Sequence, residues 1–156
     1  MTIAPPVTIR DAQSCDATAI AQLSRALAAN VADPDPGGDT ALIAEACFGP
    51  DRWIEVIVAE RGGEILGLAA SCRRFELHTR DRTLWLADLV VAEGARSQGL
   101  GSLLVQALSR RARALGCTAI VAELWVGNAS ARPFYDRIGA RTNADIEIRV
   151  IDLPRR

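Results

Sequence analysis

The chain has 156 residues, 49% of them hydrophobic, and a formal net charge of −1 at pH 7. This length corresponds to one domain, which can bury about two thirds of its unfolded surface around an apolar core. The balanced charge argues against a protein that binds nucleic acid. We therefore expect a single domain over residues 1–156.

The sequence favours a cytoplasmic protein without a bound metal. The first six residues lack the basic segment and the apolar run of a signal peptide, and no stretch reaches about 18 uninterrupted apolar residues. The cysteines are scattered, with no Cys-x-x-Cys pair and no neighbouring histidine, so we expect reduced thiols packed in the core. These cysteines are Cys15, Cys47, Cys72 and Cys117.

The N-terminal third predicts one short strand and two helices. Residues 7–10 predict the strand, and Ser14 is expected to cap a helix that runs to about residue 30. The residues expected on the core face of this helix recur at the helical period: Ala17, Ile20, Ala21, Leu23, Ser24 and Leu27. Prolines and glycines exclude regular structure from residues 33–39, and residues 40–48 predict a second, short helix.

Three apolar segments then predict an antiparallel meander. Residues 53–60 and 65–74 predict two strands, joined by the two-glycine hairpin Arg61-Gly62-Gly63-Glu64. Residues 83–91 predict the next strand. His78 is the only histidine, and it falls in the loop before this strand, where a surface position is expected.

The remaining sequence predicts a crossover unit and a closing strand. A helix rich in Leu, Ala and Arg over 102–115 precedes an apolar strand over 119–124, and such a crossover is right-handed. Another helix is expected to begin near Ala129, and alternation at 146–151 predicts a last strand. The predicted fold is an α/β domain with a mixed central sheet, an antiparallel N-terminal meander and flanking helices.

The loop after the 83–91 strand contains Arg96-Ser97-Gln98-Gly99-Leu100-Gly101. Its glycines let the backbone approach a ligand, and a helix that begins here directs unpaired N–H groups at an anion. Two other phosphate-binding motifs do not match. A P-loop requires a lysine after its second glycine, and a dinucleotide fingerprint requires a third glycine where this chain has Leu104. A nucleotide-binding module is therefore the weaker interpretation.

The order Arg-x-x-Gly-x-Gly resembles the acetyl-CoA signature of the GNAT superfamily of N-acetyltransferases, with Ser97 at a position that often holds glycine. A second segment also resembles this family. Its members commonly have an asparagine, a small residue three positions later, an aromatic-tyrosine pair and a glycine at the helix end. The matching residues are Asn128, Ala131, Phe134, Tyr135 and Gly139. The resemblance covers residues 84–140, and two linked motifs are much harder to obtain by chance than one.

The resemblance implies a GNAT-like fold, in which two parallel strands splay apart and admit the acyl-pantetheine arm of acetyl-CoA. The main chain of Leu89, Val90 and Val91 would pair with the pantetheine amides. The cofactor phosphates would lie on the loop and the helix start, formed by Arg96, Ser97, Gln98, Gly99, Leu100, Gly101 and Ser102. Asn128 would bond the pantetheine through its amide, or instead cap the helix expected near Ala129.

Acetyl transfer requires an acid that protonates the leaving thiolate. Tyr135 is the only tyrosine in the chain, and the resemblance assigns it this role. A phenol with a pKa of about 10 can donate a proton to the thiolate. The alternative is a ring that packs on the core and hydrogen-bonds the cofactor.

The base that accepts the amine proton is Asp88 in the first interpretation. Side chains alternate along a strand, so Asp88 is expected on one face with Leu84, Leu86 and Val90. Apolar neighbours raise the pKa of a carboxylate, which suits a proton acceptor. Glu123 and an ordered water are the alternatives, and either carboxylate could instead be structural.

The implied function is transfer of an acetyl group from acetyl-CoA to a primary amine of a small molecule or peptide, by direct attack in a ternary complex. No cysteine has an adjacent base that would favour a covalent intermediate. Acidic residues between the first helices suit a cationic amine or form solvated turns: Asp33, Asp35, Asp39 and Glu45. The alternative function is a CoA-binding regulatory module without turnover. The sequence indicates no nucleic-acid or membrane partner and no metal, and it leaves a homodimer open.

Overall fold

A computed structural model describes residues 5–35, 37 and 39–154. The chain forms two compact units, Met1–Trp125 and Val126–Arg156. The described part of the first unit contains a five-stranded sheet and three α-helices. The described part of the second unit contains the short helix α4 (Arg132–Arg137) and irregular chain.

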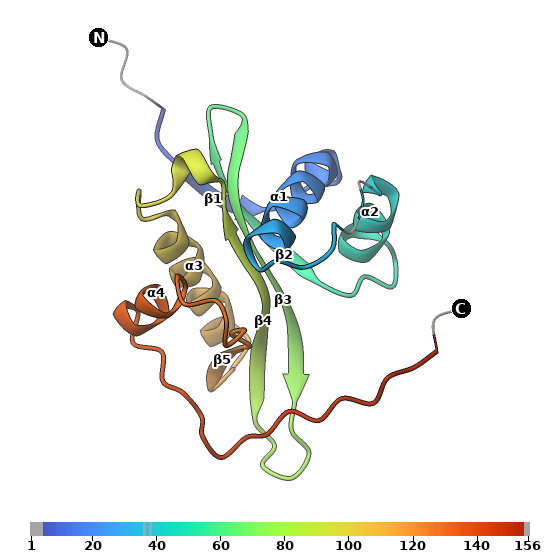
Figure 1. Ribbon diagram of the computed structural model, residues 1–156, viewed down its shortest axis with the longest axis vertical. Coiled ribbons are helices and arrows are strands. Elements are labelled where there is room, and N and C mark those ends of the chain that lie inside the picture. Colours follow the sequence, from blue (N-terminus) through green and yellow to red (C-terminus); the bar gives the residue numbers. More distant parts are fainter. Residues whose placement is uncertain (1–4, 36, 38, 155–156) are drawn as a thin grey trace. The chain divides into compact units, whose positions relative to one another are not determined.

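The sheet has the strand order β1-β2-β3-β4-β5 (Figure 1). Its strands are β1 (Thr8–Asp11), β2 (Glu55–Arg61), β3 (Glu64–Phe75), β4 (Arg82–Val91) and β5 (Ala119–Ala122). The first four strands pair antiparallel, whereas β5 is parallel to β4. The predicted α/β class, with an antiparallel meander that leads into a parallel pair, is therefore confirmed.

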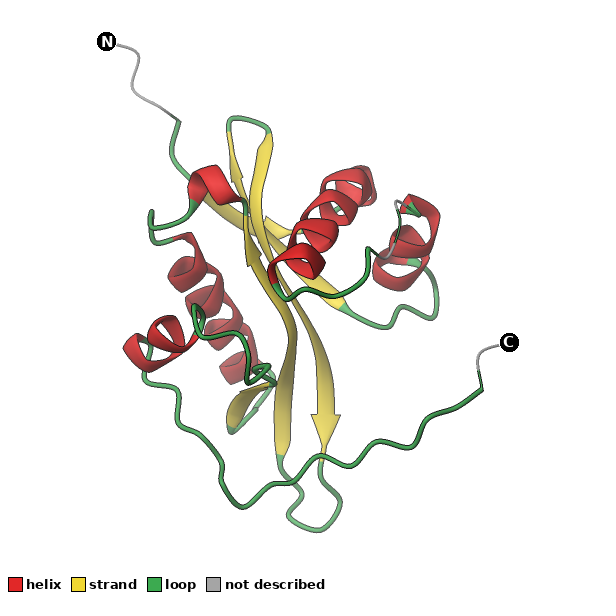
Figure 2. Cartoon of the chain, viewed as in Figure 1, coloured by secondary structure: helices red, strands yellow, loops and turns green. Residues whose placement is uncertain are grey.

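Helices cover both faces of this sheet. The helices α1 (Ala17–Asn30) and α2 (Thr40–Phe48) lie on one side, and α3 (Leu100–Ala114) lies on the other (Figure 2). The buried residues of α3 recur every four positions, which makes one apolar stripe along the helix: Leu100, Leu104, Leu108 and Ala112.

The buried apolar residues of the described chain form three clusters, and the two larger ones lie on opposite faces of the sheet. On the α1 and α2 side, Val56 and Val58 pack with residues of both helices. On the α3 side, Ile57 and Ala59 pack with the last three residues of the α3 stripe, whereas Leu100 packs in the smaller third cluster. The middle of β2 is therefore a continuous apolar run, because alternate residues enter different clusters.

The hairpin between β2 and β3 follows the sequence prediction. Arg61 pairs with Glu64 across the turn, and Gly62 and Gly63 have φ values of 59° and 85°. Glycine adopts this left-handed region readily, and a two-residue turn that matches the twist of the strands requires it.

The start of the first helix differs from the prediction, because Ser14 does not cap it. Ser14–Asp16 forms a 3-10 helix, and α1 begins at Ala17. The Asp16 carboxylate accepts a hydrogen bond from the Gln13 backbone N–H at 2.7 Å, and two from Arg10 at 2.7 and 3.0 Å. A carboxylate accepts charge-assisted bonds that are stronger than those of a hydroxyl, so Asp16 organises this turn.

Asp16→Asn is expected to lower the free energy of unfolding by about 2 kcal/mol at neutral pH, because a neutral amide has only one acceptor oxygen for the two charge-assisted bonds that Arg10 donates to the buried carboxylate. Those bonds lower the pKa of Asp16. Its contribution is therefore fully present above the unfolded pKa of about 3.9, and it is lost as the pH falls through the lower folded pKa. Urea denaturation of both proteins at neutral pH and at about pH 3 should show the difference shrinking at the lower pH.

Asp35→Asn provides the matched control for this stability prediction. Asp35 also pairs with an arginine, Arg25, at 2.8 Å, but both side chains are exposed. Exposed ion pairs contribute little to stability, so this variant should unfold almost as the parent does. Equal destabilisation by the two substitutions would contradict the role given to burial at Asp16.

The predicted closing strand at 146–151 is wrong. The segment has no regular structure, and its apolar side chains are exposed: Ile146, Ile148, Val150 and Ile151. Within the second unit, no other described residues form a strand that could pair with it. Alternation specifies which side chains share a face, whereas a strand also requires a backbone partner.

The cysteines are all free, but they do not all lie in the core. Cys47 is buried, and Cys72 and Cys117 are partly buried. Cys15 is exposed, so its predicted core position is wrong. It falls in the 3-10 helix before α1, outside the apolar face of that helix.

Candidate functional site

Strand β4 has two neighbouring strands over only part of its length. The parallel partner β5 pairs with residues 83–86, whereas β3 continues along β4 as far as Val91. Among the described residues, no strand pairs with the other edge of β4 from residue 87 to residue 91. The strand β4 therefore extends beyond the end of β5, and Leu89, Val90 and Val91 lie along the open edge.

A β-bulge interrupts β4 just before this open segment. In the pairing with β3, Ala70 lies opposite Asp88, while the next residue, Ser71, lies opposite Leu86. Ala87 is therefore an extra residue in β4. Such a bulge reverses the face that each later side chain occupies.

The bulge corrects the predicted surroundings of Asp88. Before the bulge, Leu84 and Leu86 belong to the core cluster of α3. After the bulge, Val90 belongs to the cluster of α1 and α2, and Asp88 shares its face by alternation. The prediction that Asp88 lies on one face with Leu84 and Leu86 is therefore wrong, because alternation does not hold across an inserted residue.

The Asp88 carboxylate has no hydrogen bond or ion pair with any residue in the described ranges. The residue is exposed by its accessible area, yet the protein around the carboxylate raises its pKa by desolvation. This combination describes a carboxylate that water can reach and that accepts a proton more readily than an ordinary aspartate. Glu123 is also exposed and lies just beyond the end of β5.

The loop from β4 to α3 has two residues with left-handed backbone conformations. Ser97 has a φ of 62° and Gly99 a φ of 80°, and Gly99 is the N-cap of α3. A Cβ atom built on Gly99 would meet no atom within 4 Å, so the space beside this residue is open. Non-glycine residues rarely adopt the conformation of Ser97, which marks the loop as a constrained segment.

The backbone N–H groups just before and at the start of α3 lack acceptors among the described residues, except that of Leu103. The N–H of Leu103 donates to the Gly99 carbonyl at 3.1 Å. Within the part of the chain that the structure describes, no protein group accepts from the N–H groups of residues 97–102. Unpaired N–H groups and the positive end of the helix dipole together suit a phosphate or another anion.

We define the anion cradle as residues 96–102. Two of its polar side chains form hydrogen bonds with backbone carbonyl groups, and one apolar side chain is buried. Arg96 Nε donates to the Val91 carbonyl at 3.2 Å, and Gln98 Nε2 donates to the Gly94 carbonyl at 3.2 Å. These bonds hold the loop in shape. Leu100 is only 2% exposed and packs in the core, so only its backbone is available to a ligand.

Asn128 lies in the second unit and does not cap a helix. The helix α4 begins at Arg132, with Ala131 as its N-cap and a proline in its first turn. Asn128 Oδ1 instead accepts a hydrogen bond from Ser130 Oγ at 3.0 Å. The predicted helix start near Ala129 is therefore wrong, and the cap alternative for Asn128 is removed.

Tyr135 also lies in the second unit, within α4. Its ring meets Phe134 edge to face, with the ring centroids 5.3 Å apart and the planes at 77°. Burial raises the pKa of the Tyr135 phenol above its ordinary value. The hydroxyl therefore keeps its proton at neutral pH, as a general acid must.

The sequence profile of the Acetyltransferase (GNAT) family matches residues 20–140. The chain belongs to the GNAT family of acetyltransferases. A curated relative, probable N-acetyltransferase 14 of Danio rerio, is 33% identical over 91 residues, which are 58% of this chain and 31% of the relative. This GNAT chain therefore spans less than a third of the length of that relative.

Solved structures share the fold of this GNAT chain. The ribosomal-protein-alanine N-acetyltransferase of Brucella melitensis is 22% identical, with a TM-score of 0.77, 96% of this chain covered and 100% of the other. A transcriptional regulator of Bacillus halodurans is 25% identical, with a TM-score of 0.77, 95% of this chain covered and 100% of the other. The GNAT-like fold is thereby confirmed.

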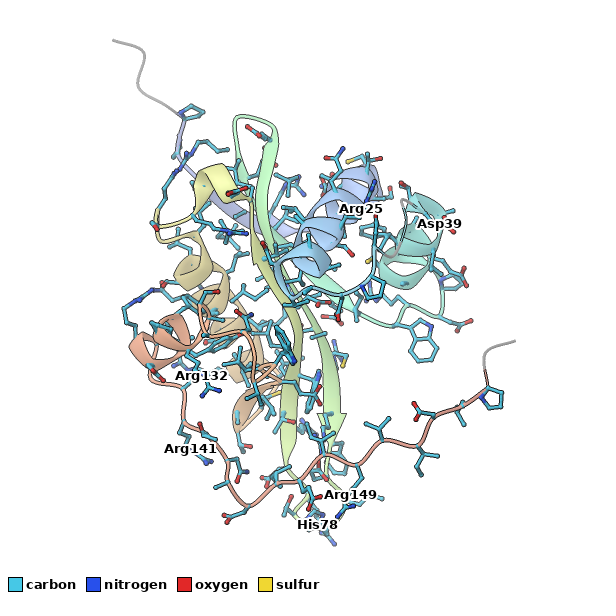
Figure 3. All side chains as sticks on the ribbon, in the orientation of Figure 1. Arg25, Asp39, His78, Arg132, Arg141 and Arg149 are labelled. Carbon is cyan, nitrogen blue, oxygen red and sulfur yellow. The ribbon has the colours of Figure 1, made fainter. Side chains whose placement is uncertain are left out.

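Two of the acidic residues near the first helices of this GNAT chain have structural roles. Asp39 caps α2 by accepting from the N–H groups of Ala41 and Leu42. Asp35 accepts from Arg25 and from the Gly37 N–H. Figure 3 shows Arg25 on α1 and Asp39 at the start of α2, and it shows His78 in the β3–β4 loop, where the predicted surface position is confirmed.

Sequence reasoning overlooked one residue that contacts the anion cradle. Arg61 lies at the end of β2, and its two terminal nitrogens both donate to Gln98 Oε1 at 3.1 Å. The two residues are 37 positions apart, so no local pattern brings them together. Only the pairing of β2 with β3, and of β3 with β4, could have suggested the contact.

No cluster of three or more His, Cys, Asp or Glu side chains that could hold a metal ion occurs in residues 5–35, 37 and 39–154. In the same ranges, no helix has the length and apolar character needed to span a lipid bilayer. A pocket of about 270 Å³ does occur near the other end of β4, beside Arg73, Arg74 and Arg82. It includes none of the predicted site residues.

Proposed function

We propose that the chain is an N-acetyltransferase that transfers the acetyl group of acetyl-CoA to a primary amine of a small molecule or peptide. The observation that carries the proposal is the set of unpaired N–H groups at the start of α3, beside the open edge of β4. Membership of an acetyltransferase family supports the reaction. The family match runs from residue 20 in the first compact unit to residue 140 in the second, which supports the proposal of one N-acetyltransferase domain over residues 1–156. A cytoplasmic location is part of the proposal.

Two parts of the chain bind the acyl carrier in this proposal. The anion cradle binds the pyrophosphate of CoA through backbone N–H groups, and Arg96 adds a positive charge. The open edge of β4 at Leu89, Val90 and Val91 pairs with the amides of the pantetheine arm, as a strand pairs with an added strand. Asn128 contributes its side-chain amide to the same arm.

The chemical step is direct attack of the amine on the thioester carbonyl within a ternary complex. The C–N bond forms and the C–S bond breaks. Asp88 accepts the proton that the amine loses, and Tyr135 protonates the departing thiolate. The raised pKa of each group suits its task, because Asp88 must accept a proton and Tyr135 must hold one at neutral pH.

Release of free thiol from acetyl-CoA in the presence of a panel of amines tests the proposal. We expect release that depends on the amine and saturates with its concentration. A CoA-binding regulatory module without turnover is the second candidate, because one relative of the same fold is a transcriptional regulator. Binding of CoA without thiol release from any amine would favour that candidate.

Gly101→Val is expected to weaken CoA binding by at least about 10-fold while the protein stays folded. Gly101 lies in the first turn of α3 and is not one of the glycines with a positive φ, so valine is compatible with its backbone. The branched side chain would project where the phosphate approaches the N–H groups. Isothermal titration calorimetry with CoA measures the loss.

Ala114→Val is the matched control, because it places the same side chain at the last residue of the same helix. This variant should bind CoA as the parent does. If the folded Gly101→Val protein bound CoA with unchanged affinity, the assignment of residues 96–102 to the cofactor would be wrong.

A further inference from the structure

Arg61 is connected to the anion cradle by a short chain of hydrogen bonds. Both terminal guanidinium nitrogens of Arg61 donate to Gln98 Oε1 at 3.1 Å. The other end of the Gln98 amide donates to the Gly94 carbonyl at 3.2 Å. The amide is thus fixed at both ends, and it holds the Arg61 guanidinium beside the loop that precedes α3.

The charge of Arg61 is not compensated by a carboxylate. Glu64 is its pairing partner across the hairpin, yet the two form no ion pair, and no other acidic residue in the described ranges pairs with Arg61. By contrast, Arg10, Arg25 and Arg73 each pair with a carboxylate. A neutral amide acceptor leaves the full positive charge of Arg61, and its remaining N–H groups, available to an anion.

Arg96 adds a second positive charge near the anion cradle. It bonds the Val91 carbonyl and likewise has no carboxylate partner within the described ranges. Two uncompensated guanidinium groups therefore flank a helix N-terminus that is itself positive. Two guanidinium groups beside unpaired backbone N–H groups suit a ligand with several phosphates.

We propose that Arg61 is a phosphate-binding residue for CoA, brought to the cradle by the β2–β3 hairpin and held there by Gln98. This inference rests on the proposed function. CoA carries phosphate in two places, the pyrophosphate and the 3′-phosphate of its ribose, and a guanidinium binds either through paired N–H bonds. Dephospho-CoA, which lacks the 3′-phosphate, separates the two sources.

Calorimetric titration of the parent and Arg61→Gln with CoA and dephospho-CoA tests the proposal. We expect the variant to bind CoA about 10- to 100-fold more weakly, the range of a charge-assisted contact. If Arg61 binds the 3′-phosphate, only the parent will prefer CoA over dephospho-CoA. If it binds the pyrophosphate, the substitution will weaken both ligands equally. Unchanged CoA affinity in Arg61→Gln overturns the inference.

Two further variants separate binding from structure. Arg61→Lys keeps the charge without the planar fork, and it should recover part of the lost affinity. Arg113→Gln removes an exposed arginine from the last turn of α3, at the far end from the cradle, and should leave CoA binding unchanged. Thermal unfolding of each variant verifies that it is folded. A parent protein that bound neither CoA nor dephospho-CoA would overturn the proposed function and this inference with it.

Discussion

Replacing Tyr135 with phenylalanine is expected to lower turnover by about 10² to 10⁴-fold, with little change in the affinity for acetyl-CoA. The substitution keeps the ring and its edge-to-face contact with Phe134, and it removes only the hydroxyl. A phenol is protonated at neutral pH, and burial raises the pKa of Tyr135 further, so the proton is available to the leaving thiolate. Loss of the hydroxyl should therefore act on the chemical step. Thiol release measures turnover, and calorimetry measures affinity.

Two outcomes would change the role of Tyr135. Equal losses in affinity and turnover would indicate that the hydroxyl positions the cofactor rather than protonates the thiolate. Turnover close to that of the parent would exclude both functions. The pH dependence gives an independent readout, because the raised pKa predicts no loss of the acid below about pH 10.

Asp88→Asn is expected to lower the rate at neutral pH by about 10² to 10⁴-fold and to remove the acidic limb of the pH-rate profile. The amide cannot accept the amine proton. In the parent, the raised pKa of Asp88 should place this limb above the ordinary pKa of an aspartate. Measuring kcat/KM across the pH range for both proteins tests the prediction.

The thermal stability of Asp88→Asn gives a second test of the role of Asp88. Asp88 has no hydrogen-bond partner among the described residues, and its folded pKa lies above the unfolded value. Ionisation of Asp88 therefore destabilises the folded protein. This destabilisation is absent below the pKa of Asp88 in the unfolded chain, and it grows as the pH rises through the higher pKa of the folded protein. At neutral pH, Asp88→Asn should unfold at the same temperature as the parent or at a higher one.

A lower melting temperature combined with an unchanged pH profile would contradict both expectations for Asp88. Such a result would identify a structural carboxylate and leave Glu123 or an ordered water as the base. Glu123→Gln is therefore the matched control. It should change neither the pH profile nor the rate if Asp88 accepts the proton.

Much of the fold could be predicted because its signals are local. The apolar stripe of α3, the continuous apolar runs of the central strands and the two glycines between Arg61 and Glu64 each act within a few residues. The anion cradle also lies in one short stretch of sequence, so its position after β4 followed from the order of a strand, two glycines and a helix. The roles of Asp88 and Tyr135 remain predictions for the experiments above, and the role of Asn128 also remains a prediction.

The predictions that were wrong share a different cause. Each depended on a contact with residues elsewhere in the chain, which the local sequence does not specify. Ala87 looks like any strand residue, and only its pairing with β3 reveals that it is extra and reverses the face of Asp88. Serine is a common helix N-cap residue, which favoured Ser14. In the structure, however, Arg10 donates two hydrogen bonds to the Asp16 carboxylate, and the helix begins after Asp16. The segment 146–151 alternates well, yet a strand is defined by a neighbour that its own sequence does not encode.

The one-sided pairing of β4 beyond residue 86 has a consequence for the protein without its ligand. Among the described residues, no strand pairs with the backbone groups of this open edge, so another chain of amide groups can add to the sheet there. In the proposed function, the pantetheine arm would serve as that additional short strand. Part of the free energy of binding would then also be free energy of folding, and the substrate would act as a missing structural element of the enzyme.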